Sequence, residues 1–349
     1  MKTPCMQGAL GRTGHIGLIV LALLGAGCKK RRPPGPATTT IASAAAPVAE
    51  SAPAQDEKPR LRPSVKASRP LLDPVLKYVA ADGLRGPASV LHDDVSDVYL
   101  VSNVDGSPTA RDGNGFISKL SPDGKKILLR WIEGGKRKVV LNAPKGMALR
   151  GNELFVADID TVRVFDRRTG APRGEIKIEG ATFLDDVTLA PDGRVLVSDA
   201  GMKANAAGDG LEESGTDAVY SVYRDERVTS VVLVAKKSLA GPTALLGTPD
   251  KTWGVMFRTG EVYSIGKGGT LEDVHMLPDG ELEGIAGAGR ELLVSSRAAS
   301  AIFRGTPGGD WRIAVGDVKS PGDIDYDRKR KRVLVPLFTE NEVRIYGLE

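Results

Sequence analysis

The chain has 349 residues, of which 41% are hydrophobic and 5% aromatic, and its formal net charge at pH 7 is +4. The charge is uneven: residues 1–70 carry 11 Lys/Arg and 3 Asp/Glu, a net +8, and the remaining 37 basic and 41 acidic residues give residues 71–349 a net −4. A mildly acidic body with few aromatic side chains argues against nucleic-acid binding. Because the two cysteines are Cys5 and Cys28, residues 71–349 hold no disulfide and no thiolate.

An export signal is predicted at the start of the chain. Lys2 and Arg12 precede the apolar run Ile16–Leu24 (IGLIVLALL), and the small residues 25–27 lead to Cys28. This order of basic, apolar and small residues is typical of a bacterial export signal. The apolar run is too short to span a bilayer, which takes about 20 residues.

The end of this signal, residues 24–28 (LGAGC), resembles the lipobox of bacterial lipoproteins. The resemblance implies that Cys28 is lipidated and becomes the new N-terminus, although Gly25 stands where the motif prefers Leu. The alternative is a plain secretory signal. The basic run Lys29–Arg32 resists translocation, but it can hold an exported chain against anionic head groups. We therefore expect residues 1–28 to direct the protein to the cell envelope, lipid-anchored on the periplasmic or outer-membrane face.

Residues 29–70 are interpreted as a tether. Beyond the basic run, this stretch is rich in Pro, Ala, Ser and Thr and has almost no large apolar residues, so it cannot bury enough surface to order itself. If it is coil-like, about 40 residues span on the order of 35 Å. The folded domain, residues 71–349, would thus be held off the membrane, and we expect it to be a monomer.

From residue 84 onward the chain repeats itself. The units open at equivalent positions, and the steps between them are 57, 40, 58, 40 and 39 residues; these positions are Ser89, Gly146, Asp186, Ala244, Gly284 and Asp323. Each unit has a second strand of continuous apolar residues, such as Leu154–Ala157 (LFVA), which suits burial on both faces. Steps near 40 fit the four-stranded blades of a β-propeller, so an all-β, six-bladed propeller is predicted.

The two long steps are explained by insertions rich in Gly, Asp and Ala. These are residues 103–115 and 201–216, and both fall between the second and third strands of their units. Pro-Asp-Gly at 122–124, 191–193 and 278–280 predicts turns. The apolar stretch 75–79 is a candidate outer strand for the last blade, which would close the ring and leave no open sheet edge.

Residues 184–199 (LDDVTLAPDGRVLVSD) resemble the repeat units of the regucalcin and gluconolactonase family, and of the related NHL and strictosidine-synthase-like propellers. The resemblance covers about residues 84–349 and implies a six-bladed fold. The family's enzymes open lactones or related esters with a divalent metal held at the channel mouth by one Glu, two Asn and one Asp. At those positions this chain has Arg85, Pro144 or Lys145, Asp185 and Thr243, and only Asp185 can still bind a metal.

Charged residues at the blade openings are the candidate ligand-binding set, because in this family the openings and the loops after the second strands share one face. The set comprises Arg85, Lys145, Asp185, Asp186, Glu283 and Asp323, with Asn103, Asp158 and Asp199 at strand ends. Clustered carboxylates can hold Ca²⁺, which takes six to eight oxygens, and Asp185 and Glu283 are the candidate pair for it or another divalent metal. The simpler interpretation of each carboxylate is a cap on backbone amides. Lys145 and Arg85 can instead favour an anionic ligand.

The remaining motifs give weaker evidence of a functional site. Asp323, Asp325 and Asp327 alternate as in a calcium loop but lack its glycine, so we expect turn and edge charges on one face of a strand. The basic run Arg328–Arg332 is expected in a hairpin turn. Residues 71–349 contain two histidines, which excludes a histidine-rich metal site; His92 is placed in a turn and His275 in an outer strand.

Three functions remain open at this stage. The first is a membrane-tethered, extracytoplasmic propeller that binds a ligand at the mouth of its channel without catalysis. The second is a divergent metal-dependent lactonase or esterase. The third is a protein-interaction module for an envelope partner, which would use the same face and its two long loops.

Overall fold

The structure, a computed structural model, describes residues 74–223, 229–235 and 238–348. The predicted signal, Cys28 and the tether lie outside these residues. Within the described part of the chain, no helix has the length and apolar character needed to cross a bilayer.

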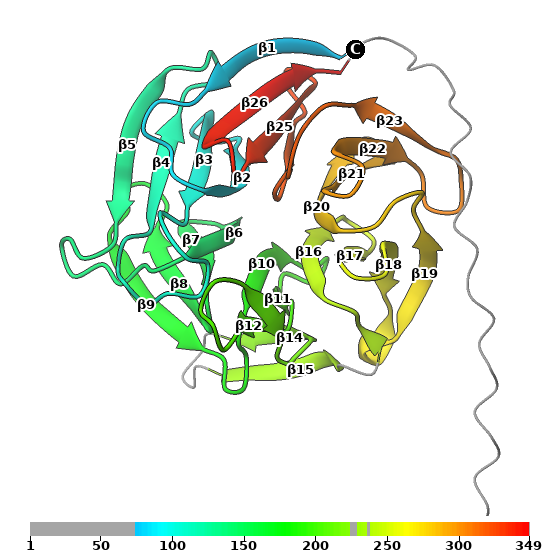
Figure 1. The fold of residues 1–349 in the computed structure, drawn as a ribbon, viewed down its shortest axis with the longest axis horizontal. Helices are drawn as coiled ribbons and strands as arrows, with labels where there is room; N and C mark the ends of the chain where they lie inside the picture. Colours follow the sequence, from blue (N-terminus) through cyan, green and yellow to red (C-terminus); the bar gives the residue numbers. More distant parts are fainter. Residues whose placement is uncertain (1–73, 224–228, 236–237, 349) are drawn as a thin grey trace, which may run out of the picture. The chain divides into compact units, whose positions relative to one another are not determined.

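Six four-stranded antiparallel sheets surround a central axis as blades (Figure 1). From the inner to the outer strand, the first three blades are β2 (Pro87–Asp93), β3 (Val98–Asn103), β4 (Phe116–Leu120), β5 (Lys126–Glu133); β6 (Pro144–Arg150), β7 (Glu153–Asp158), β8 (Thr161–Asp166), β9 (Pro172–Lys177); β10 (Leu184–Leu189), β11 (Val195–Asp199), β14 (Ala218–Tyr223), β15 (Thr229–Ala235). The last three are β16 (Pro242–Gly247), β17 (Thr252–Met256), β18 (Glu261–Ile265), β19 (Leu271–Met276); β20 (Leu282–Ala288), β21 (Glu291–Ser296), β22 (Ala301–Gly305), β23 (Trp311–Val315); β24 (Asp325–Asp327), β25 (Arg332–Leu337), β26 (Glu342–Gly347), β1 (Val75–Ala80). The predicted six-bladed propeller is confirmed.

Burial explains why the middle of each second strand is apolar. Every residue of β3 and β11 is buried, whereas the outer strand β9 is mostly exposed. The core is divided into clusters shared by neighbouring blades: one joins Phe155 of the second blade to Val197 of the third. Because each sheet packs on both faces, the middle of a second strand is apolar on both sides, and polar residues stand at its ends.

The ring closes as predicted, with β1 pairing antiparallel to β26 as the outer strand of the last blade. A cluster containing Tyr99 and Ile345 fills the closing interface between the last blade and the first. Polar contacts add to it: Asp323 accepts from the Ser89 hydroxyl at 2.6 Å, and Asp327 accepts from the Tyr99 hydroxyl at 2.6 Å. The alternating aspartates thus share one face, as expected, but that face meets the first blade and is not an edge.

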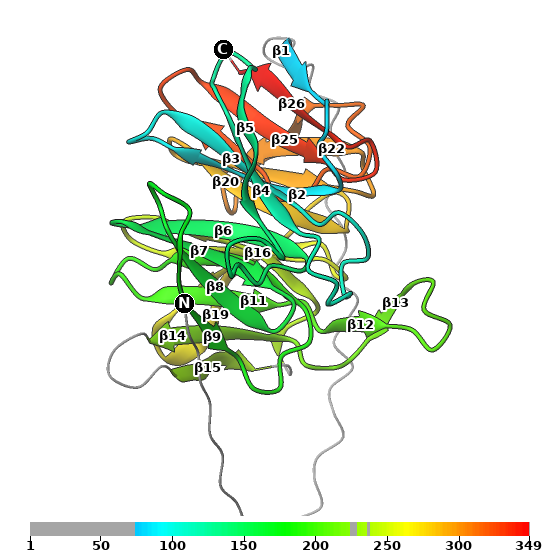
Figure 2. The same cartoon turned by 90° about the vertical axis from the view of Figure 1, so that its left-hand side faces the viewer.

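Both insertions lie where they were predicted, between the second and third strands of the first and third blades. The second insertion contains a hairpin of its own, formed by β12 (Met202–Ala204) and β13 (Leu211–Glu213). Figure 2 shows this hairpin projecting from the ring. The η2 turn (Lys267–Gly269) lies between β18 and β19.

The prediction for His92 was wrong. It lies within β2, its side chain is 8% exposed, and its ring meets that of Tyr99 edge-on with 5.4 Å between the centroids. The turn begins two residues later than the His-Asp-Asp sequence indicated. His275 lies in the outer strand β19, as predicted, and residues 328–331 form the turn between β24 and β25.

Candidate functional site

A bulge in five of the six inner strands positions the candidate site. The first residue of the inner strand pairs with the last residue of the second strand, as Leu184 does with Asp199, and the register then shifts. The same shift follows Pro87, Pro144, Pro242 and Leu282. A bulge re-aims the side chain at that point. The residues just after these openings all line one pocket at the channel mouth: Ala88, Lys145, Asp185, Thr243, Glu283 and, after Pro321, Gly322.

A second set of lining residues comes directly after the second strands. These residues are Val104, Ala200, Phe257, Arg297 and Phe338. The insertions add Pro108, Met202 and Leu211, and the loop before β10 adds Phe183. The pocket has a volume of about 270 Å³, near the lower end of the range of about 300–1,000 Å³ for small-molecule sites.

Lys145 is the buried cation of this pocket, with 5% of its surface exposed. Its ammonium lies 3.4 Å from the carbonyl oxygen of Pro108, 3.3 Å from that of Leu184, and 4.0 Å from the centre of the Phe183 ring. Burial lowers the pKa of Lys145, and the nearby charge of Asp185 partly opposes that shift. The ammonium is therefore held by carbonyl dipoles and an aromatic face.

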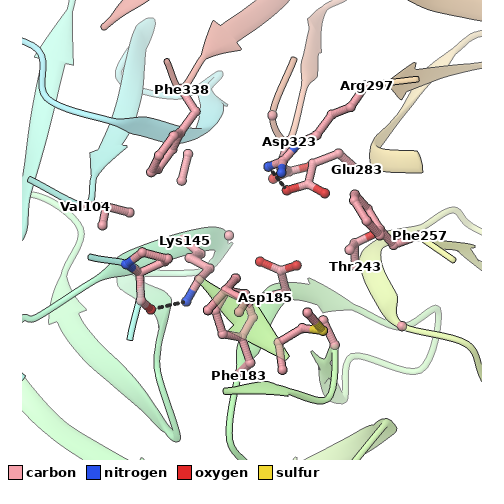
Figure 3. Close-up of a pocket in the computed structure, with 18 of the residues that line it drawn as sticks. Val104, Lys145, Phe183, Asp185, Thr243, Phe257, Glu283, Arg297, Asp323 and Phe338 are labelled. Carbon is pink, nitrogen blue, oxygen red and sulfur yellow. Dashed lines mark hydrogen bonds and ion pairs between the residues drawn. The ribbon is translucent and has the colours of Figure 1, made fainter. Parts of the chain in front are cut away.

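Two carboxylates, those of Asp185 and Glu283, face the same space. Asp185 and Glu283 point into the pocket from different blades; the ring of Phe257 lies beside Glu283, and that of Phe338 lies across the pocket (Figure 3). Glu283 forms an ion pair with Arg297, whereas Asp185 makes no hydrogen bond or ion pair with any part of the chain that the structure describes. Burial, and then the charge of Glu283, raise the pKa of Asp185 well above its usual range.

Asp323 is also part of the lining, but its carboxylate meets the Ser89 hydroxyl of the first blade. Burial, and next the charge of Asp186, raise its pKa well above the usual value, although the Ser89 hydroxyl donates to it. Burial likewise raises the pKa of Glu283, which Arg297 opposes. Burial is the main cause of the raised pKa in all three groups, and repulsion by another carboxylate comes next for Asp185 and Asp323.

Two residues of the predicted set lie outside the pocket. Asp186 is 4% exposed and accepts hydrogen bonds from the backbone amides of Leu245 and Val187, both at 2.7 Å. Its burial raises its pKa to about 7. Arg85 is exposed, and its backbone amide donates to Asn103 at 3.0 Å. The pocket lining thus includes Lys145, Asp185, Glu283 and Asp323 of the six.

The strand-end side chains act as caps. Asp158 accepts from the backbone amides of Asn142 and Ala143 at 3.1 and 2.9 Å, and Asp199 accepts from those of Phe183 and Gly201, both at 3.0 Å. Asn103 does the same for Arg85. These contacts agree with the simpler interpretation, in which strand-end carboxylates fix the loops that lead into the inner strands.

The divalent metal that the family resemblance implies does not fit these residues. The described part of the chain contains no group of three His, Cys, Asp or Glu residues that could hold a metal ion. Lys145 places an ammonium among the carboxylates, and Arg297 already pairs with Glu283. Asp325 and Asp327 are likewise engaged, by the His92 amide and by Tyr99 and Arg330. We therefore derive no reaction step through a metal.

The aromatic and arginine side chains of the lining were not predicted. Phe257, Arg297 and Phe338 each follow the last residue of a second strand directly. Because those strands were recognised in the sequence, this offset is the signal that would have found them.

Comparison with known proteins supports the fold. No family model and no curated protein matches the chain. Among solved structures, a gluconolactonase from Xanthomonas campestris is 15% identical with a TM-score of 0.57, covering 83% of this chain and 99% of its own. Virginiamycin B lyase from Staphylococcus aureus is 14% identical with a TM-score of 0.52, covering 78% of this chain and 99% of its own. At such identities the likeness is one of fold alone, and the chain is a six-bladed β-propeller with gluconolactonase-like structural neighbours.

Proposed function

We propose that this protein is a membrane-tethered, extracytoplasmic propeller that binds a small ligand at the mouth of its channel. The observation that carries the proposal is the pocket itself. All six blade openings contribute to it, its walls are largely apolar, and a few charged groups converge inside it. Concave apolar sites with a few convergent polar groups are where small molecules bind.

The point where the chain enters the propeller supports the tether. Val75, the first residue of β1, pairs with Gly347, which pairs with Arg332 at the start of β25. That end of the last blade carries the β24–β25 turn, and the mouth lies at the other end. The described chain therefore begins on the face opposite the mouth, which is where a tether that leaves the mouth accessible would attach.

The lactonase alternative has weaker support. In the family, the reaction uses a metal ligand set, and here the corresponding positions are filled by Lys145, Asp185 and Thr243 and by the exposed Arg85. An interaction with an envelope protein is the other use of the same face. A pocket of this volume suits a small molecule better than the surface of a partner protein.

A thermal-shift screen of the full chain tests the binding function. A ligand at about 100 times its dissociation constant should stabilise the folded state by roughly 2.7 kcal/mol. We expect hits to be lost in Ala88→Phe, which fills the mouth, and kept in Ala206→Phe, which adds the same ring to the exposed hairpin tip. Hits that still bind Ala88→Phe would show that the ligand site lies elsewhere.

Labelling with a radioactive fatty acid tests the anchor. We expect incorporation in the wild-type chain and in Cys5→Ala, but none in Cys28→Ala, because Cys5 and Cys28 are the two cysteines of the chain. Equal labelling of Cys28→Ala and wild type would refute the proposed lipidation at Cys28.

A further inference from the structure

The charges of the mouth do not cancel. Of its lining cations, Arg297 pairs with Glu283, and Arg258 pairs with Asp217 and, at 3.6 Å, with Glu213. This leaves Lys145 to oppose Asp185, while the Ser89 hydroxyl donates to Asp323. Its ammonium lies against carbonyl oxygens and the Phe183 ring, and no ion pair joins it to either carboxylate among the described residues.

The unpaired carboxylates are set in an apolar wall. Phe257, Phe338, Val104 and Met202 line the pocket around them. Aromatic faces attract cations, and Lys145 over Phe183 shows this contact already in use at the mouth. Such walls cannot supply the oxygen ligands that replace the water around a metal ion, but they can bury the hydrocarbon part of an organic cation.

We propose that the mouth binds a small organic cation, an ammonium group attached to an apolar body. The ammonium lies between the carboxylates of Asp185 and Glu283, and the body packs against Phe257 and the other apolar side chains of the lining. An anion would meet Asp185, which has no partner among the described residues, and a neutral molecule would leave that carboxylate unpaired. This inference rests on the proposed ligand-binding function and specifies its ligand class.

Three probes that share one skeleton test the inference. Phenylethylamine, phenylethanol and phenylacetate carry the same ring with a positive, a neutral and a negative end. Titration calorimetry on the full chain should show tightest binding for the amine. Because a hydrogen bond to a charged group contributes about 1.5–3 kcal/mol, Asp185→Asn should weaken the amine by about tenfold to a hundredfold and leave the alcohol nearly unchanged.

Matched variants separate charge from shape. Phe257→Leu should weaken binding of both the amine and the alcohol. Asp94→Asn, which changes an exposed carboxylate outside the pocket lining, should leave the binding of both unchanged. Binding of phenylacetate that is lost in Lys145→Met would overturn the cation inference while the mouth remained a ligand site. Amine binding unaffected by Asp185→Asn would also overturn it. If none of the probes bound a folded protein up to its solubility limit, the ligand class and the proposed function would both be rejected.

Discussion

At the mouth, Asp185 is a carboxyl group for which the described part of the protein supplies no hydrogen bond and no ion pair. We expect Asp185→Asn to stabilise the fold, because the amide replaces a carboxyl group whose ionisation is opposed by burial and by the charge of Glu283. The gain should be on the order of 1 kcal/mol, measured as the free energy of unfolding in urea near pH 7. A loss of stability would show that Asp185 has a compensating partner and is structural.

Residue by residue, the sequence predicted the acidic mouth only in part. Asp185 and Asp186 are neighbours of one type, yet the first lines the pocket and the second accepts two backbone amides within the wall. Neighbouring side chains on a strand point to opposite faces, and a bulge shifts this alternation by one residue. Repeats in the sequence locate the opening of a blade, but they do not show the bulge.

Among the secondary-structure elements, two buried tyrosines form a matched pair. Tyr99 in β3 donates to Asp327 across the closing interface, whereas the hydroxyl of Tyr263 in β18 is buried with no partner in the described structure. We expect Tyr99→Phe to destabilise the protein by about 1–3 kcal/mol, since a buried carboxylate loses a donor. Tyr263→Phe should be neutral or stabilising. Chemical denaturation of both variants checks this, and equal effects would show that the closing hydrogen bond contributes nothing specific.

Strand order was more predictable than insertion structure. Apolar second strands and Pro-Asp-Gly turns recur at fixed spacing, and β1 was recognised because a ring needs its outer strand. The β12–β13 hairpin was expected only as a loop. Its residues 202–213 are mostly small, polar or charged, and such residues have low strand propensity, so the pairing is not visible in composition.

For the whole molecule, the buried carboxyl groups predict how stability depends on pH. Burial raises the pKa of Asp186 from 3.8 to about 7, and it also raises those of Asp185, Asp323 and Asp325. Between about pH 4 and pH 7 the folded chain therefore binds more protons than the unfolded chain. The free energy of unfolding should therefore fall as pH rises from about 4 to about 7.

Carboxylates paired with arginine change the free energy of unfolding in the opposite direction, but in a different pH range. The pKa of Asp93, bonded to Arg167, and that of Glu291, bonded to Arg304 and Arg312, lie below their usual values despite partial burial. Their stabilisation is lost only as pH falls below about 4, so maximum stability is expected near pH 4–5. Urea midpoints measured in steps from about pH 4 to pH 8 should decline. Asp186→Asn should flatten that decline, whereas the control Asp94→Asn should leave it unchanged. Midpoints that rose with pH would mean that these buried carboxyl groups are stabilised as anions.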